Sequence, residues 1–340
     1  IHGSSAVINK IINTLNKFKN LRIAEPGEFT RRAFENNKLD LTQVEAISDL
    51  VNSETEAQRK QALNHLNGKF SYKINIWSDK ITKILANIEA SIDFSDEDLP
   101  SNLILNTKEQ IKNICKEIKI YIEDNKVGEK IRSGYIVAIL GKPNVGKSSF
   151  INAIAERDIA IVTSEPGTTR DAIELFTDLK GFPVKFFDTA GIRKASNQAE
   201  SLGVSKSYKI SDIADVNLIF IENEKDIDDF VKINNKIYVQ SKIDIIKKIL
   251  SKKKIYYISS KTGYGISELF DKIYEDFLLK NKITDDNISR ERHRKILKNT
   301  LNFMHKSLYP KSVDLFSEDI RLSLNEISKI SGKIDVEDIL

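Results

Sequence analysis

The chain has 340 residues, of which 40% are hydrophobic and 30% charged, a composition typical of globular proteins with two or three domains. Its 53 basic and 49 acidic residues leave a net charge of +4, which argues against a surface coated with basic charge but not against a local basic patch. The sequence contains no run of about 18 apolar residues and no signal-peptide pattern at its start. Together with a single cysteine, Cys115, these features predict a cytoplasmic protein with no membrane partner.

Long helices are expected in the first third of the chain, where apolar residues recur at steps of three and four. A capping-box pattern at residues 42–45 predicts the start of one helix there. The other expected helices cover residues 7–18, 70–92 and 107–124. Each apolar stripe is typical of a helix face that packs in a core, and none resembles a cofactor-binding motif.

From about residue 133 the pattern changes to short apolar runs between helices, which predicts a mostly parallel sheet covered by helices on both faces. The expected strands cover residues 135–140, 173–179, 183–188, 216–221, 236–240 and 254–258, with a hairpin turn at residues 181–183. Sheets of this kind bind ligands at the carboxyl ends of their strands. A ligand site is therefore expected at that edge.

Directly after the first expected strand, residues 141–148 spell G-x-x-x-x-G-K-S and lead into an apolar helical pattern. This order predicts a phosphate-binding loop, in which Gly141 and Gly146 let the backbone wrap a polyphosphate. Lys147 is expected to neutralise the outer phosphates, and the Ser148 hydroxyl to hold Mg²⁺. The other loop residues expected to bind the nucleotide are Asn144, Val145 and Ser149. A structural glycine-rich turn is the alternative interpretation.

A second motif, D-T-A-G at residues 188–191, ends the third expected strand. Asp188 is expected to reach Mg²⁺ through water and the Gly191 amide to sense the γ-phosphate, as in the GTPase form of this element. Between the two motifs lie Thr168 and Thr169, and Thr169 can give Mg²⁺ a second hydroxyl and loosen when the γ-phosphate leaves. Motifs in this order indicate a GTPase.

Base recognition is expected at the S-K-I-D motif of residues 241–244. The Asp244 carboxylate can accept hydrogen bonds from the guanine N1–H and exocyclic amine, a donor pair that adenine lacks, and the Lys242 stem can lie over the base. Ser241 replaces the usual asparagine, at a cost of about 0.5–1.5 kcal/mol for one neutral hydrogen bond. A second base-contacting loop is expected at Ser259, Ser260 and Lys261. These motifs favour GTP as the nucleotide. A small-molecule kinase, which shares the phosphate loop, is a less favoured alternative because Lys242 and Asp244 would have no role in it.

With these motifs the chain resembles the TrmE/MnmE family of tRNA-modification GTPases over essentially its whole length. The resemblance rests on the segments P-G-E-F-T-R-R-A-F, L-D-L, I-D-F, D-T-A-G-I-R and R-H-R, at residues 26–34, 39–41, 92–94, 188–193 and 292–294. It implies an α/β plus all-α fold, in which a Ras-like P-loop GTPase domain is inserted into a long-helix bundle. The implied parts are the tail of an amino-terminal folate-binding domain (1–38), the two halves of the helical domain (39–132 and 281–340) and the GTPase domain (133–280).

The resemblance also implies that both ends of this sequence are truncated. The chain begins near the end of the family's folate-binding domain and lacks the C-x-G-K tetrapeptide with which the family ends. A folate derivative, which the intact family member binds, is therefore not expected to bind fully to this chain.

Many GTPases orient the attacking water with a glutamine at the position of Ile192, which cannot do so. In the family, as the resemblance implies, K⁺ and dimerisation of the GTPase domains supply the catalytic charge instead. The implied K⁺ ligands are Asn144, Thr163, Glu165 and Thr168. The implied water-positioning residue is Glu200, which completes a catalytic set with Lys147 and Asn144. The alternative interpretation of Glu200 is a solvated carboxylate at the start of a helix.

The task that the resemblance implies is addition of an aminomethyl-type group to carbon 5 of the wobble uridine of tRNA. The implied agent is a homodimer that acts with the flavin-dependent protein MnmG (GidA). The basic run formed by Arg290, Arg292, His293 and Arg294 could contact tRNA phosphates or that partner, and a solvated helix face explains it equally well. A GTP-controlled RNA- or ribosome-binding switch is the competing function, and the helical flanks favour the modification family over it.

Overall fold

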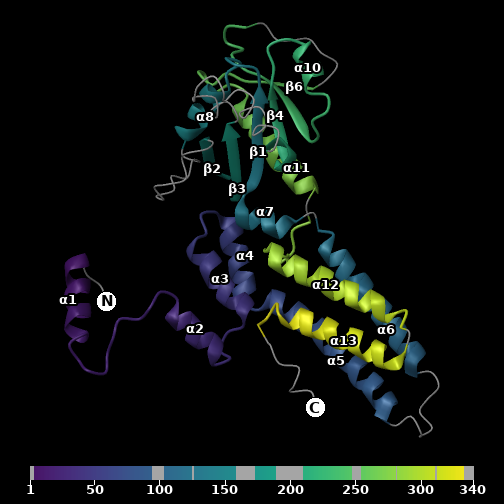
Figure 1. Ribbon diagram of the computed structural model, residues 1–340. Helices are drawn as coiled ribbons and strands as arrows, with labels where there is room; N and C mark the ends of the chain where they lie inside the picture. Colours follow the sequence, from purple (N-terminus) through teal and green to yellow (C-terminus); the bar gives the residue numbers. More distant parts are fainter. Residues whose placement is uncertain are drawn as a thin grey trace, which may run out of the picture.

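The computed structural model of the protein describes residues 4–93, 103–124, 126–157, 173–188, 210–246, 254–280, 282–310 and 312–332. Figure 1 shows two parts of different architecture, a β-sheet with its helices at the top and a bundle of long helices below it. The chain forms the sheet in its middle section and returns to the bundle near its end. Within the described ranges, none of the helices is both long and apolar enough to serve as a membrane span.

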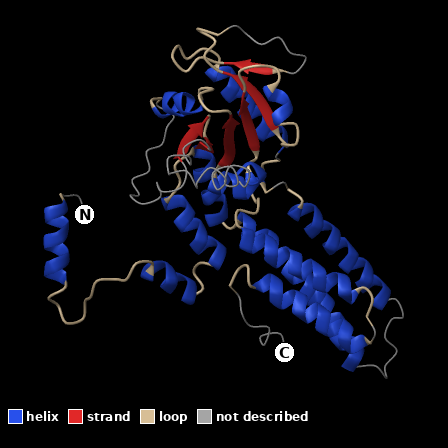
Figure 2. Ribbon diagram, turned by 45° about the horizontal axis from the view of Figure 1, so that its top comes forward, coloured by secondary structure: helices blue, strands red, loops and turns tan. Residues whose placement is uncertain are grey.

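A single sheet of six strands, in the order β2-β3-β1-β4-β5-β6, organises the middle of the chain (Figure 2). β2 runs antiparallel to β3, and the other neighbours are parallel. The strands are β1 (Tyr135–Gly141), β2 (Ile173–Leu179), β3 (Phe182–Asp188), β4 (Val216–Phe220), β5 (Lys236–Gln240) and β6 (Ile255–Tyr257). Their bounds differ from the predicted ones by no more than a residue at either end, because strands covered on both faces are continuous apolar runs.

The hairpin between β2 and β3 turns at Lys180 and Gly181, whose φ angles are +54° and +87°. A two-residue turn with positive φ at both positions matches the right-handed twist of the strands that it joins. The turn predicted at residues 181–183 is therefore placed too late, since Phe182 and Pro183 already belong to β3.

Several helices accompany the sheet and join it to the bundle. Those whose bounds the structure describes in full are α7 (Val127–Ser133), α8 (Lys147–Ala155), α10 (Asp226–Asp229) and α11 (Ile266–Lys280). Phe150 of α8 is fully buried and packs against Phe186 of β3 and Phe220 of β4. The helix that follows the phosphate loop is thus fixed to two strands of the sheet, and α7 leads directly into β1, the strand that carries the loop.

The bundle combines helices from both ends of the chain. The helices outside the sheet region are α1 (Ser5–Leu15), α2 (Glu28–Glu35), α3 (Leu41–Val51), α4 (Glu56–Leu66), α5 (Lys69–Asp93), α6 (Leu103–Ile122), α12 (Glu291–Ser307) and α13 (Val313–Ser328). Trp77 of α5, Met304 of α12 and Ile320 of α13 belong to one buried core. The prediction that the two helical halves pack into one bundle is therefore confirmed.

Capping boxes at the starts of α3 and α4 differ from the sequence analysis. The capping box of α3 uses Asp40 and Gln43, with Gln43 N donating to Asp40 Oδ1 over 2.9 Å and Asp40 N to Gln43 Oε1 over 3.0 Å, so the box predicted at residues 42–45 is wrong. A second capping box, formed by Thr55 and Gln58, opens α4, a helix that was not predicted. The T-x-x-Q pattern at that point is a helix-start signal that could have identified it.

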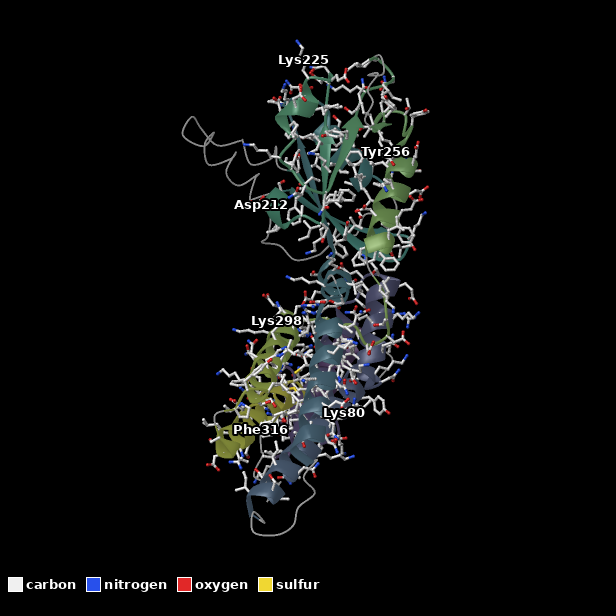
Figure 3. All side chains as sticks on the ribbon, turned by 90° about the vertical axis from the view of Figure 1, so that its right-hand side faces the viewer. Lys80, Asp212, Lys225, Tyr256, Lys298 and Phe316 are labelled. Atoms are coloured by element: carbon white, nitrogen blue, oxygen red, sulfur yellow. The ribbon has the colours of Figure 1, made fainter. Side chains whose placement is uncertain are left out.

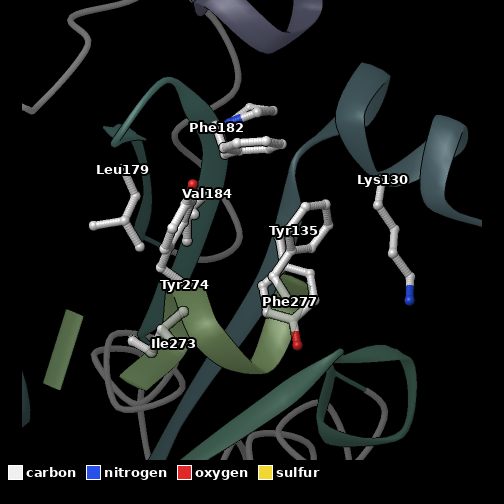
Figure 4. Close-up of a pocket in the computed structure, with 9 residues that line it drawn as sticks. Lys130, Tyr135, Leu179, Phe182, Val184, Ile273, Tyr274 and Phe277 are labelled. Atoms are coloured by element: carbon white, nitrogen blue, oxygen red, sulfur yellow. The ribbon is translucent and has the colours of Figure 1, made fainter. Parts of the chain in front are cut away.

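A small cavity lies between β1, β3 and α11 (Figure 4). Its lining is mostly apolar and includes Tyr135, Phe182 and Phe277, and its volume is about 10 Å³. A space of this size holds at most one water, which would need polar partners. The cavity is therefore a feature of core packing and not a ligand site.

His65 of α4 is buried against the segment that enters α12. Its Nε2 lies 3.0 Å from the Asn287 carbonyl oxygen, and its Nδ1 lies 3.4 Å from the Ser289 hydroxyl. A neutral ring satisfies both contacts, by donating from Nε2 and accepting at Nδ1. Burial lowers the pKa of His65 to about 4.

We expect the free energy of unfolding to fall as the pH decreases from 7 to 5. Unfolded histidine titrates near 6.5, so between pH 6.5 and 4 the unfolded state binds a proton that the folded state excludes. The neutral ring thus stabilises the fold above pH 6.5, and about 2 kcal/mol of this is lost between pH 7 and 5. His65→Gln keeps a donor for Asn287 but does not titrate, so its urea midpoint should vary less with pH. An equal pH dependence in both proteins would refute this assignment.

Candidate GTP-binding site

Both glycines of the phosphate loop occupy positions where no side chain fits. Gly141 has a φ of +142°, and a Cβ there would lie 2.4 Å from the Phe220 carbonyl oxygen. Gly146 has a φ of +102°, and its Cβ would lie 2.2 Å from Ser241 Oγ. The loop therefore packs its bare backbone against β4 and against the S-K-I-D motif, at the carboxyl ends of the central strands.

Lys147 begins α8 and its ammonium group is held across the loop. The side chain is 5% exposed, and Nζ donates to the Gly141 carbonyl over 2.8 Å and to the Lys142 carbonyl over 2.6 Å. These contacts fix a positive charge beside backbone amides at the positive end of a helix. The arrangement is suited to binding the phosphates of a nucleotide.

The residues predicted to hold Mg²⁺ lie next to each other. Ser148 Oγ donates to Asp188 Oδ2 over 3.1 Å, and Asp188 is fully buried at the end of β3. A hydroxyl and a carboxylate are the hard oxygen donors that Mg²⁺ prefers, and at phosphate sites it takes only one or two protein ligands. This pair therefore fits Mg²⁺, although the described residues contain no cluster of three or more His, Cys, Asp or Glu side chains for a metal held by protein alone.

The S-K-I-D motif is tied to the phosphate loop by two of its side chains. The Ser241 hydroxyl donates to the Val145 carbonyl, and Lys242 Nζ donates to the Asn144 carbonyl over 2.6 Å. Ser241 is 4% exposed and directly faces Gly146. The hydroxyl that replaces the usual asparagine is thus used to hold the loop, which leaves base recognition to the other residues of the motif.

Asp244 meets the second predicted base loop directly. Ser259 Oγ donates to Asp244 Oδ1 over 2.7 Å, and this hydrogen bond holds the pKa of Asp244 below its usual value. The carboxylate is therefore ionised and acts only as an acceptor. The neighbouring Ser260 hydroxyl is buried with no hydrogen-bond partner among the described residues, so it is an orphaned polar group at the predicted base position.

Comparisons with known proteins agree with this geometry. The family model "MnmE helical domain" matches residues 41–340, and "GTP-binding protein TrmE N-terminus" matches residues 1–38. The tRNA modification GTPase MnmE of Pelagibacter ubique is 41% identical over 353 aligned residues, which cover 100% of this chain and 80% of that relative. MnmE of Rhodopseudomonas palustris is 39% identical, over 100% of this chain and 79% of the relative. The chain belongs to the MnmE family of tRNA modification GTPases.

Membership of the MnmE family confirms the predicted enzyme class, a GTPase, and the predicted combination of a P-loop GTPase sheet with a helical domain. Among solved structures, the G domain of the T. maritima FeoB iron transporter matches 42% of this chain and 98% of that chain, at 24% sequence identity and a TM-score of 0.31. A TM-score this low carries no weight for function.

Several predicted site residues of this MnmE-family chain lie outside the described residues. They are Thr163, Glu165, Thr168, Thr169, Gly191 and Glu200. Their proposed roles stay predictions. Of the other predicted contacts, Val145 is buried within the loop, Ser149 is exposed in the first turn of α8, and Lys261 is exposed beside Ser260.

The sequence analysis missed one residue that fixes the loop. Lys142 Nζ lies 2.5 Å from Asp226 Oδ1 and 3.1 Å from Asp229 Oδ2, so it joins the phosphate loop to α10. Asp226 is buried and also accepts from the amides of Glu222 and Asn223. The lysine occupies a variable position of the loop pattern, and its partners are distant in sequence, so no local signal could have identified it.

The basic run at the start of α12 is paired with carboxylates of the same chain. The nitrogen–oxygen contacts are Arg290–Asp49 (2.7 Å), Arg292–Glu45 (3.0 Å), His293–Glu45 (2.9 Å), Arg294–Asp124 (2.7 Å) and Arg294–Glu129 (2.8 Å). Burial alone would raise the pKa of Glu45, but its hydrogen bond to His293 and the nearby arginines lower it overall. His293 and Arg294 are buried, so both predictions for this run, contact with RNA or a partner and a solvated face, are wrong for these two residues.

Proposed function

We propose that this chain binds and hydrolyses GTP to drive addition of an aminomethyl-type group to carbon 5 of the tRNA wobble uridine, together with the flavin-dependent protein MnmG (GidA). The observation that carries the nucleotide part is the junction between the two motifs. Ser241 and Lys242 donate to carbonyls of the phosphate loop, while the ionised Asp244 stays available for a guanine base. Phosphate and base recognition are thus built into one connected unit.

In this proposal Lys147 and the loop amides bind the β- and γ-phosphates, and Asp244, Lys242 and the loop of Ser259, Ser260 and Lys261 orient guanine. Ser148 and Thr169 would hold Mg²⁺ directly and Asp188 through water, with the Gly191 amide beside the γ-phosphate. When bound, Mg²⁺ neutralises charge on the phosphates during transfer. Glu200 would orient the attacking water, which Ile192 cannot do.

We further propose that the site uses K⁺, with Asn144, Thr163, Glu165 and Thr168 as ligands. Asn144 supports this because its side chain is exposed in the loop, and no described residue forms a hydrogen bond with its amide group. Its φ of +65° belongs to the left-handed region, which asparagine tolerates better than most residues. A monovalent cation at this point would place positive charge where negative charge develops in the transition state of hydrolysis, provided that two GTPase domains dimerise around the nucleotides.

The remaining parts of the proposal concern organisation. The domain boundaries are placed at residues 39, 133 and 281, and residues 1–38 are assigned to the tail of a folate-binding domain. The folate derivative is expected to bind fully only to a longer chain. Because tRNA is the substrate, we place the activity in the cytoplasm.

GTP turnover is expected to be fast in K⁺ and nearly basal in Na⁺ at the same ionic strength. The reason is that Ile192 cannot orient the attacking water, whereas the exposed Asn144 side chain offers an amide oxygen to a monovalent cation. Steady-state phosphate release by the full chain in the two salts tests this, with Glu200→Ala as a second arm that binds GTP normally but turns over at least tenfold more slowly. Equal rates in K⁺ and Na⁺ would count against the proposal, and normal turnover of Glu200→Ala would remove that residue from it.

A further inference from the structure

Helix α6 lies beside α12 in the bundle (Figure 1), and both helices carry exposed lysines. On α6, Lys112, Lys116 and Lys119 are spaced by four and three residues, so they share one side of that helix. Lys126 follows α6, and Lys298 comes from the neighbouring α12. Figure 3 labels Lys298 at the end of the bundle that is nearer to the sheet.

An open cleft of about 400 Å³ lies at this point. It is lined by Lys119, Lys126 and Lys298 and by the apolar side chains of Ile122 and Leu301. We call it the lysine cleft. Its size falls within the range of small-molecule sites, and it combines charged groups with apolar surface, as sites for nucleotide-sized groups do.

The described residues do not neutralise the three lysines of the cleft. None of them forms an ion pair with a carboxylate of any described residue. Arg294 also lines the cleft, but Asp124 and Glu129 already pair with it, and Glu123 is the one lining carboxylate left. In a chain with a net charge of only +4, this is a local excess of positive charge that favours an anionic ligand.

We propose that the lysine cleft binds the sugar–phosphate backbone of tRNA. The proposal rests on the proposed function, which makes tRNA the substrate. Lysine ammonium groups are common phosphate contacts, and such contacts position the nucleic acid without reading its sequence. A backbone seated in the cleft can continue along α6, since Lys119 and Lys112 are separated by about 10 Å at the helical rise of 1.5 Å per residue. A concave cleft with an apolar lining suits a nucleotide unit better than the flat surface of an acidic protein.

The test compares tRNA binding by the full chain with two triple variants. The cleft variant carries Lys119→Gln, Lys126→Gln and Lys298→Gln. The matched control carries Lys17→Gln, Lys225→Gln and Lys232→Gln, which remove the same charge from exposed sites remote from the cleft. Filter binding of an unmodified tRNA transcript is measured from 50 to 200 mM salt, beside GTP turnover without RNA.

We expect the cleft variant to bind tRNA at least tenfold more weakly, with a log–log salt slope smaller by about 2, as expected for loss of about three phosphate contacts. Because phosphate contacts carry no sequence information, the loss should be equal for cognate and non-cognate tRNA. The control should bind within twofold of wild type, and GTP turnover should be unchanged in both variants. Lysine-to-arginine changes at the three cleft positions should preserve binding, which separates charge from packing.

Unchanged tRNA affinity and salt slope in the cleft variant would overturn the cleft, while tRNA binding by the wild type would leave the proposed function standing. A wild type that binds no tRNA at all would overturn both the cleft and the proposed function. If the cleft variant lost binding of the flavin-dependent partner or of anionic lipid vesicles while its tRNA affinity stayed intact, the cleft would be a surface for that ligand and the RNA assignment would fail.

Discussion

Asp244→Asn is expected to shift the nucleotide preference of this protein from GTP toward XTP. The ionised carboxylate can accept from both the N1–H and the exocyclic amine of guanine, and the Ser259 hydroxyl holds it in place. An asparagine keeps one acceptor and introduces an amide donor, which opposes the guanine amine but suits the carbonyl that xanthine carries there. Each charge-assisted bond contributes about 1.5–3 kcal/mol, so GTP affinity should fall about a hundredfold or more.

Titration of fluorescent GTP and XTP analogues in Mg²⁺ measures this change as a ratio of dissociation constants. Ser241→Ala is the matched control, because the Ser241 hydroxyl donates to the Val145 carbonyl of the phosphate loop and is not expected to contact the base. This variant should lower the affinities for GTP and XTP to the same extent and leave the ratio of the two dissociation constants unchanged. If Asp244→Asn kept the wild-type ratio, guanine would have to be recognised elsewhere.

The sequence was sufficient wherever a local pattern carries its own physical cause. The strand, loop and helix around Gly141 and Lys147 follow from an apolar run, two positions without room for a Cβ, and a helix start. The same holds for the long helices, whose apolar stripes have a helical period. Helix ends were predicted less well, because similar capping patterns can lie close together in a sequence. The box predicted at residues 42–45 is only two residues away from the actual one, formed by Asp40 and Gln43.

Contacts between distant segments could not be predicted in this way. Ser241 looked like a lost hydrogen bond, but the fold brings its hydroxyl to the Val145 carbonyl and gives the side chain a different task. Lys142 occupies a position that tolerates many residues, and only the sheet order places it beside Asp226. The basic run near Arg294 resembled a surface for anions, because no acidic partner is evident beside it in the sequence. Its partners Glu129 and Asp124 lie more than a hundred residues away along the chain.

Arg294 also joins the bundle to the strand that carries the phosphate loop. Its guanidinium pairs with Asp124, just after α6, and with Glu129, inside α7. It donates to the Ile122 carbonyl as well. Because α7 leads directly into β1, this one side chain of α12 fixes the approach of the chain to the nucleotide site. Burial opposes its charge, yet the two carboxylates raise the pKa of Arg294 overall.

Arg294→Met is expected to lower the free energy of unfolding by about 3–5 kcal/mol, the cost of breaking a buried ion pair from one side. The methionine fills much of the space but leaves the carboxylates of Asp124 and Glu129 without their cation, and Asp124 Oδ2 already lacks a partner among the described residues. Arg321→Met is the matched control, since Arg321 pairs with Glu89 at 2.7 Å but has a side chain 46% exposed, and such pairs contribute about 1 kcal/mol or less. Urea unfolding followed by circular dichroism measures both variants. Equal midpoints for Arg294→Met and Arg321→Met would show that the buried cluster does not hold the bundle to the sheet.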